Sequence, residues 1–517
     1  MKSYINKSLL ILGLSSLITF GCGEEDITKL PVTALAEDEF WKSEDQVAQA
    51  TNAAYFSLPG VGQVMWDALT EVMYSQSGSI TQISTGSIGP GAGLVNSVWT
   101  GMYGTIRDAN WFLENVEKAK SAADLTDADL AKYKGQMRFV RAYAHYQLLF
   151  HFGDVPLVER VLDINEGVVA PTARNTVRDW VLAELDQTIT ELSSNDYDPE
   201  FGRITEWAAK AFKARVLLYE GTLASDNAML TNAANVAKDV IDNGGFSLHP
   251  TYTELFRPEG DRSSEVILAR VYRDQEGSYH SLGQWLGPKS FHAAWNIISP
   301  TVALVETYPD INGEDISTSG LYDPNEPFDN RDPRLNQTIF DWRVDVDYEG
   351  ASFVNEGTWY NFRKFIDPSE VSEQRSHNDY IIFRLAEMYL TYAEAMNEVN
   401  GPSQAGLDYI NELRTRGGVG AGAGGTDIAV PAITLAGLTQ ADMRAIIQRE
   451  RIIEMVGEGF LYYDYHRWGL LDETMNSPAV AVVPLENRTF TNPRDYEWPY
   501  PDFEVINNSL LIQKDGY

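Results

Sequence analysis

The chain has 517 residues, of which 44% are hydrophobic and 11% aromatic, so it can build a large folded core. Its 40 Lys and Arg residues face 74 Asp and Glu residues, which gives a formal net charge of −34 at pH 7. This charge repels nucleic acid and disfavours an acidic polysaccharide unless calcium or a local basic patch intervenes. We therefore expect no nucleic-acid partner and a neutral ligand, although a high charge also serves solubility alone.

Residues 1–21 have the pattern of a lipoprotein signal peptide. Lys2 and Lys7 precede a short apolar run at 9–20, and the only cysteine of the chain, Cys22, follows it. The run is shorter than the roughly 20 apolar residues that cross a bilayer, which predicts a removable segment. Cleavage before Cys22 allows that thiol to be acylated and leaves a lipid-anchored chain with a net charge of −36.

Helical periodicity dominates the rest of the chain. In residues 134–152 the aromatic residues Phe139, Tyr143, Tyr146 and Phe150 recur at helical spacing, and a second apolar stripe predicts packing on both sides. Gly153 and a following proline predict the end of this helix.

Similar helical patterns occupy residues 204–219 and 382–396, and the latter pairs with a second helix that ends near residue 418. Alanines alternate with large aromatic residues, as in tetratricopeptide-like units of about 34 residues that stack side by side. We predict a mostly α-helical superhelix of helix pairs, with long irregular loops and a few short strands, one of them within 265–272. Residues 22–517 then form one body, with a helical scaffold at about 37–240 and 378–470.

The loop-rich region, mainly 57–96 and 246–377, contains the candidate ligand-binding residues. Flat aromatic side chains stack on the apolar faces of sugar rings, while amide and guanidinium groups bond to the hydroxyls. Loops this long in a compact protein usually carry function. The candidate stacking residues are Trp66, Tyr74, Trp285, Trp295, Trp359 and Tyr360, and the candidate hydrogen-bonding residues are Asn296 and Arg363.

Several motifs, taken in chain order, resemble the SusD/RagB family of outer-membrane glycan-binding lipoproteins. The resemblance runs nearly end to end, and departs from the family pattern at Leu461 and at 497–501. The motifs lie at Trp99 to Asn110, Arg138 to Leu157, Lys213 to Tyr219, Arg384 to Ala395, Ile410 to Arg416, and Glu450 to Trp468.

This resemblance implies a lipoprotein on the surface of the outer membrane of a Bacteroidetes-type bacterium. It implies that the chain captures an oligo- or polysaccharide and delivers it to a SusC-like TonB-dependent transporter. A binding protein of this kind needs no catalytic residue, cofactor or metal. The RagB side of the resemblance leaves peptide uptake as an alternative.

A surface glycoside hydrolase is a second alternative, because Glu450, Glu454 and Glu458 recur at steps of four and could supply paired carboxylates. We expect them instead to form modest ion pairs on a helix face with Arg451 and Arg467. The sequence has no phosphate-binding loop, nucleophile elbow or zinc-protease motif. His145 and His151 stand six residues apart, which is the wrong spacing for a shared metal face on a helix.

Overall fold

The computed structural model describes residues 40–122, 124–192, 201–275, 277–289, 294–341, 358, 360–476 and 487–517. Three predicted features therefore lie outside the described residues: the signal segment 1–21, the lipidation residue Cys22 and the stacking candidate Trp359. Among the described helices, none is both long and apolar enough to span a bilayer.

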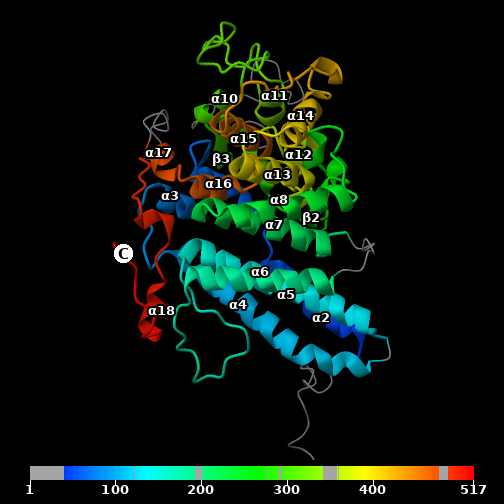
Figure 1. Cartoon of the computed structure of the whole chain (residues 1–517), viewed down its shortest axis with the longest axis vertical. Helices are drawn as coiled ribbons and strands as arrows, with labels where there is room; N and C mark the ends of the chain where they lie inside the picture. Colours follow the sequence, from blue (N-terminus) through cyan, green and yellow to red (C-terminus); the bar gives the residue numbers. More distant parts are fainter. Residues whose placement is uncertain are drawn as a thin grey trace, which may run out of the picture.

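A stack of antiparallel helices forms the main body (Figure 1). Each long helix packs on the next, and α8 packs on α13 across the long region that separates them in sequence. The predicted fold class, a mostly α-helical superhelix of helix pairs, is confirmed. The stacked helices are α2 (Glu44–Ala54), α4 (Gly93–Asn115), α5 (Asp127–Phe152), α6 (Arg174–Glu191), α7 (Glu206–Ala224), α8 (Asn227–Asn243), α13 (Leu385–Asn400), α14 (Gln404–Gly418) and α15 (Gln440–Met455).

Local sequence explains where these helices begin and end. Thr126 and Asp129 form a reciprocal capping box at the start of α5, and the helix stops at Gly153, whose φ of 64° suits glycine. Thr439 and Asp442 cap α15 in the same way. Most of α5 from Gly135 onward is buried, as the two apolar stripes predict.

Short elements fill the loop-rich region and the C-terminal part. Strand β1 (Met73–Ser75) pairs antiparallel with β3 (Ile298–Pro300), and β2 (Val266–Arg270) pairs antiparallel with β4 (Tyr380–Arg384). The short α-helices are α3 (Gly78–Ser84), α9 (Leu282–Leu286), α10 (Val302–Thr307), α11 (Arg334–Thr338), α12 (Pro368–Glu373), α16 (Leu461–Trp468), α17 (Leu471–Met475) and α18 (Asp502–Asn507). The 3-10 helices are η2 (Tyr55–Ser57), η3 (Val61–Leu69), η4 (Val116–Ser121), η5 (Glu254–Phe256), η6 (Pro258–Gly260), η7 (Ala423–Gly425) and η9 (Arg494–Tyr496).

The predicted strand at 265–272 is present as β2, but the predicted start of the helix at Ile382 is wrong. Residues Tyr380–Arg384 form β4, all five are buried, and α13 begins only at Leu385. β-branched and aromatic side chains suit a buried strand, and pairing with β2 decides the outcome.

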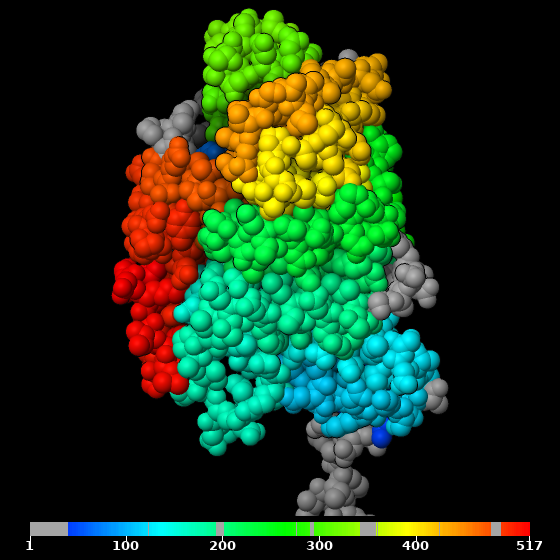
Figure 2. Space-filling view, in the orientation of Figure 1, coloured from blue at the N-terminus to red at the C-terminus, as the bar shows by residue number. Residues whose placement is uncertain are grey.

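The C-terminal segment runs along one side of the helical stack (Figure 2). The backbone N–H of Trp498 donates to the carbonyl of His151 at 2.7 Å, and its indole stacks on the His151 ring at 4.3 Å. The Tyr500 hydroxyl donates to the carbonyl of Asp154 at 2.5 Å. These contacts fasten the last part of the chain to the C-terminal end of α5.

Candidate functional site

Three loop segments meet beside the β1/β3 ladder. Tyr74 lies opposite Ser299 in this ladder. One residue beyond β1, the backbone N–H of Gln76 donates to the carbonyl of Ile297 at 2.8 Å. Four predicted site residues, Tyr74, Trp285, Trp295 and Asn296, are thereby brought into one region.

The Trp295 side chain is held open to solvent, with 52% of its surface exposed. Its backbone N–H donates to the carbonyl of Gln284 at 2.7 Å, and Ile297 donates to the carbonyl of Trp285 at 2.8 Å. Both acceptors belong to α9, so a short helix fixes the backbone on either side of the exposed ring. A fixed backbone reduces the conformational entropy that this segment loses when a ligand stacks on the indole.

Asn296 helps to hold the segment that carries Trp295 in place from its buried side. Its side chain is buried, its φ is 48°, and its Oδ1 accepts a hydrogen bond from the Ser299 hydroxyl at 2.9 Å. The side-chain amide of Gln76 donates to the Asn296 carbonyl at 3.0 Å. The prediction of Asn296 as a ligand contact therefore changes to a positioning role, and the exposed Gln76 is a rim residue that the sequence did not single out.

Tyr360 and Arg363 lie on a neighbouring segment, which is attached to the residues after α11. The backbone N–H of Arg363 donates to the Thr338 carbonyl at 2.8 Å. Burial, with a contribution from the nearby Glu306 carboxylate, raises the pKa of Tyr360 above its ordinary value. Glu306 belongs to α10, which follows β3 directly. Trp285 and Tyr360 are both half-buried.

Trp66 does not join this region. Its ring stacks on Trp498 at 5.5 Å with an interplanar angle of 8°, and the His151 ring lies 4.9 Å away. Its neighbours are thus part of the packing that fastens the C-terminal segment, and we leave Trp66 out of the candidate binding face.

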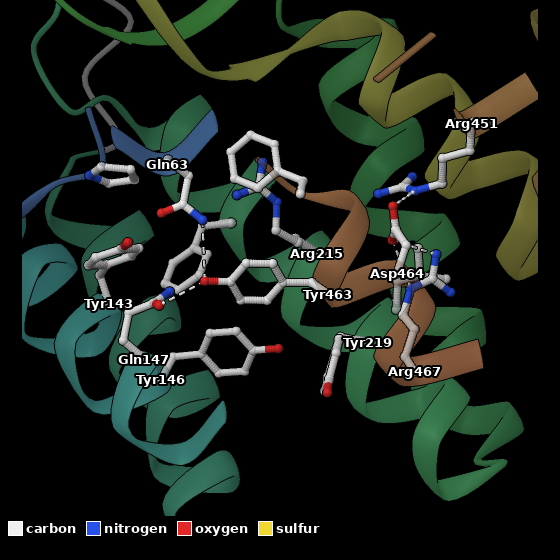
Figure 3. Close-up of a pocket in the computed structure, with 14 residues that line it drawn as sticks. Gln63, Tyr143, Tyr146, Gln147, Arg215, Tyr219, Arg451, Tyr463, Asp464 and Arg467 are labelled. Atoms are coloured by element: carbon white, nitrogen blue, oxygen red, sulfur yellow. Dashed lines mark hydrogen bonds and ion pairs between the residues drawn. The ribbon is translucent and has the colours of Figure 1, made fainter. Parts of the chain in front are cut away.

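A second, enclosed space lies inside the helical stack (Figure 3). The Tyr463 hydroxyl sits between Gln63 and Gln147, and it donates to Gln147 Oε1 at 3.0 Å. On the other side of this space, Arg451 Nε donates to Asp464 at 2.6 Å. The cavity volume is only about 30 Å³, which suits roughly one or two water molecules, whereas small-molecule sites span about 300–1,000 Å³. This space therefore cannot hold a sugar ring.

Comparisons with known proteins agree with the motifs. The family model described as "SusD family" matches residues 264–517. A second family model, described as "Starch-binding associating with outer membrane", matches residues 30–218. A SusD-like protein of Formosa agariphila is 27% identical, over 96% of both chains. The chain belongs to the SusD/RagB family.

Solved structures of SusD-like proteins share this fold. A SusD-like carbohydrate-binding protein from Bacteroides fragilis superposes with a TM-score of 0.77 at 25% identity, and the match covers 92% of this chain and 100% of that one. Surface glycan-binding protein A from Bacteroides thetaiotaomicron, in complex with laminarihexaose, gives a TM-score of 0.69 at 18% identity and covers 91% and 99%.

The charged SusD/RagB motif residues of α15 are buried, so the predicted modest ion pairs on a helix face with Arg451 and Arg467 are wrong. Glu450 accepts from Arg334 Nη1 at 2.7 Å and also contacts Arg414. Glu454 accepts from Arg384 at 2.6 Å and also contacts Arg416. Burial favours the neutral acid, but the two arginines outweigh it and lower the pKa of Glu454 to about 2.

The third carboxylate of this motif lies just beyond the end of α15. Glu458 accepts from Lys364 Nζ at 2.7 Å and from Arg384 at 2.7 Å. The predicted partners Arg451 and Arg467 instead contact Asp464, at 2.6 and 3.0 Å. The motif carboxylates therefore pair with basic residues of other segments in the interior, which fits a packing role and leaves no open pair for acid–base chemistry.

The histidines of α5 are also interior residues. His145 is fully buried, its Nδ1 lies 2.9 Å from the Arg141 carbonyl, and burial lowers its pKa to about 3. His151 is stacked between Trp66 and Trp498. Within the described ranges, no group of three or more His, Cys, Asp or Glu side chains is arranged to hold a metal ion.

Proposed function

We propose that this chain binds a neutral oligo- or polysaccharide on the face around Trp295 and does not cleave it. The exposed and backbone-fixed indole of Trp295 is the observation that carries this proposal. Tyr74 and Trp285 supply further aromatic surface, because backbone hydrogen bonds join their segments to that of Trp295. Tyr360 and Arg363 stay candidate contacts on the separate segment that joins the end of α11. Such open saccharide sites typically bind with dissociation constants from millimolar to micromolar, about −4 to −8 kcal/mol.

The names of the matched proteins support a glycan as the ligand. One matching family description is starch-binding, and one structural neighbour holds laminarihexaose. The same description names association with the outer membrane, in agreement with a lipid anchor at Cys22. We therefore place the protein on the outer membrane, attached through Cys22, as a partner of a SusC-like TonB-dependent transporter.

An exposed apolar patch supports a protein partner. Ile164 and Val168 are 97% and 50% exposed on the loop after α5, and Ile506 of α18 is 81% exposed. Asn508 Nδ2 donates to the Val169 carbonyl at 2.7 Å, so the two segments adjoin, as the lower left of Figure 1 shows. Large exposed apolar side chains on adjoining segments can mark an interaction site. We assign this patch to transporter docking.

Affinity electrophoresis through a panel of neutral and acidic polysaccharides, with reducing-sugar release measured in parallel, tests the binding function. Trp295→Ala is expected to lower glycan affinity at least tenfold. The matched control is Trp111→Ala. Trp111 belongs to helix α4, is 38% exposed and packs beside Trp41, away from the face around Trp295. The control is expected to leave affinity unchanged.

Each remaining outcome of this assay contradicts the proposal. Sugar release that a single Glu or Asp substitution abolishes would establish a hydrolase. Failure of every glycan to retard the protein, together with binding of oligopeptides, would establish the peptide-uptake alternative. Equal loss of affinity in Trp295→Ala and Trp111→Ala would remove Trp295 as the platform.

Docking is tested separately. Ile164→Glu with Ile506→Glu is expected to abolish co-purification of a TonB-dependent barrel from detergent-solubilised outer membranes while glycan affinity stays unchanged. If the barrel co-purifies undiminished with this variant, the assignment of the patch to transporter docking is wrong.

A further inference from the structure

A basic groove lies between the C-terminal end of α2, η2 and the end of β2. It has a volume of about 630 Å³, within the usual range for small-molecule sites. Four arginines, Arg203, Arg262, Arg270 and Arg273, line it, and its described lining includes no Asp or Glu. In a chain with 74 acidic and 40 basic residues, this is a strong local reversal of charge.

Aromatic rings alternate with these arginines. Phe56 is 80% exposed, although an apolar ring of this size is usually buried. Guanidinium groups near aromatic faces form cation–π contacts that hold both partners in place. The pairs are Arg203 over Tyr55 at 5.5 Å, Arg262 over Phe201 at 5.8 Å, and Arg270 over Phe56 at 5.8 Å.

Backbone geometry brings the two walls of the groove together. Gly202 has a φ of 94°, and a Cβ at this position would lie 2.6 Å from Val271 Cγ2. Only glycine permits this close approach, which sets Phe201 and Arg203 beside the end of β2. On the other wall, Arg270 Nη1 donates to the Leu58 carbonyl at 3.1 Å.

Arg262 is held in an unfavourable backbone conformation. Its φ is 62°, in the left-handed region that glycine and asparagine adopt more readily. A residue of another type there costs about 1 kcal/mol or more. Packing does not require a long cationic side chain at this exposed position, so the guanidinium of Arg262 is open to a ligand.

Two arginines of the groove remain available for a ligand. Arg262 and Arg273 are exposed, and neither forms an ion pair with another described residue. Asp261 and Asp379 lie close enough for Arg262 to favour their ionised forms, yet burial raises their pKa values to about 7 and about 6. Two carboxyl groups carry at most two negative charges, so they do not cancel four guanidinium groups.

We propose that this groove is a second binding site, which takes the anionic group of an acidic saccharide. Guanidinium groups bind carboxylate and sulfate oxygens through paired N–H donors, and Phe56 offers a stacking face for the sugar ring that bears the anion. The saccharide part of this proposal rests on the glycan-binding function above, whereas the anion part does not. The site is distinct from the face around Trp295.

One polymer backbone with different substituents tests the proposal. Dextran, carboxymethyl-dextran and dextran sulfate share their sugar and differ only in charge, and poly-L-glutamate carries carboxylates without sugar. Binding of each to the whole folded chain is measured by isothermal titration calorimetry at two salt concentrations. We expect at least one anionic dextran to bind, with weaker binding at higher salt, and to bind at least tenfold more tightly than dextran or poly-L-glutamate.

The test variant is Arg262→Asn with Arg273→Gln, because asparagine tolerates the left-handed backbone at 262 and both positions are exposed. It is expected to weaken anionic dextran binding at least tenfold, and Phe56→Ala to weaken it about threefold or more. The matched control, Arg107→Gln with Arg160→Gln, removes the same charge from exposed positions elsewhere and is expected to change nothing.

Three results would overturn the proposal. These are no binding of either anionic dextran, equal weakening in the test and control variants, and equal or tighter binding of poly-L-glutamate, which would indicate an acidic peptide partner. Trp295→Ala separates the two sites, because it is expected to lower neutral-glycan affinity and leave anionic dextran binding intact. Whether the carboxymethyl or the sulfate polymer binds more tightly identifies the anion.

Discussion

Arginine serves two different purposes in two regions of this molecule. Around α15, Arg384 is fully buried and contacts Glu265, Glu454 and Glu458, at 2.9, 2.6 and 2.7 Å. In the basic groove, Arg262 and Arg273 are exposed beside aromatic rings and form no ion pair with a described carboxylate. The buried arginines are paired with carboxylates and define packing, whereas Arg262 and Arg273 keep donors for a ligand. Residue type alone therefore does not reveal the role of an arginine.

The largest loss of stability is expected from breaking the buried ion pairs around α15. Glu454→Ala leaves Arg384 and Arg416 short of a partner in the interior, which is expected to lower the free energy of unfolding by about 3–5 kcal/mol. Urea unfolding followed by circular dichroism measures this loss. Glu166→Gln is the control, since its pair with Arg160 is exposed and its removal is expected to have no measurable effect. Similar unfolding curves for both variants would refute the contrast.

Asp67 is a buried carboxylate of a different kind, because its hydrogen-bond donors are backbone N–H groups and not arginine side chains. Three backbone N–H groups, of Gly457, Gly459 and Leu461, donate to its carboxylate at 2.8–3.0 Å. Burial outweighs these bonds and raises its pKa to about 7, opposite to Glu454. The folded state therefore retains a proton that the unfolded state releases, and this group lowers stability as pH rises from about 4 to about 7.

Asp67→Asn is expected to remove this dependence on pH. The stability of the variant relative to the parent should rise by up to about 1.4 kcal/mol per pH unit between pH 5 and 7 and level off above that range. Chemical unfolding at several pH values measures the slope. Asp442→Asn, at the exposed N-terminal cap of α15, is the control and should show no slope over the same range. A flat difference for Asp67→Asn would contradict the raised pKa.

Arg270 is intermediate between the two regions. Its guanidinium lies over Tyr272 and Phe56 and donates to the Leu58 carbonyl, so it both packs and lines the groove. Arg270→Gln is expected to cost about 1 kcal/mol of stability and also to weaken anionic dextran binding. Thermal unfolding and calorimetry check the two effects. A loss of stability without any loss of binding would place Arg270 with the buried arginines.

The smallest effect is expected at the exposed end of the groove. Arg262→Asn with Arg273→Gln should lower the free energy of unfolding by less than about 0.5 kcal/mol, or raise it where asparagine relieves the left-handed backbone at 262, while it weakens anion binding at least tenfold. Urea unfolding of this variant provides the measurement. A large loss of stability would show that these two arginines are structural after all.

Local pattern was sufficient to predict α5, α7, most of α13 and the end of α14. The aromatic stripes and the Gly153 stop identify α5, and the resemblance of the motifs identifies the family. Local pattern failed where a distant partner decides the outcome. The start of α13 depends on pairing with β2, more than a hundred residues earlier, and the burial of Glu450 depends on Arg334.

The candidate site was predictable only in part, for the same reason. A loop tryptophan is a binding platform if it is exposed and a packing residue if other side chains cover it. The sequence alone does not show which side chains cover it. Trp295 is exposed, whereas Trp66 meets Trp498 from the far end of the chain. The basic groove was missed because its arginines converge from separate segments around Phe56, and only the need for a local basic patch could be stated in advance.

The hydrogen bonds of Asp67 have a consequence for how the chain is made. They join η3 to residues 390 to 394 positions further along, so this part of the core cannot close until residues 457–461 are available to fold. Contacts of such long range also slow folding, because a large loop must be ordered before they form. Closure of this part of the core is therefore a late, cooperative step of folding that needs the C-terminal part of the chain.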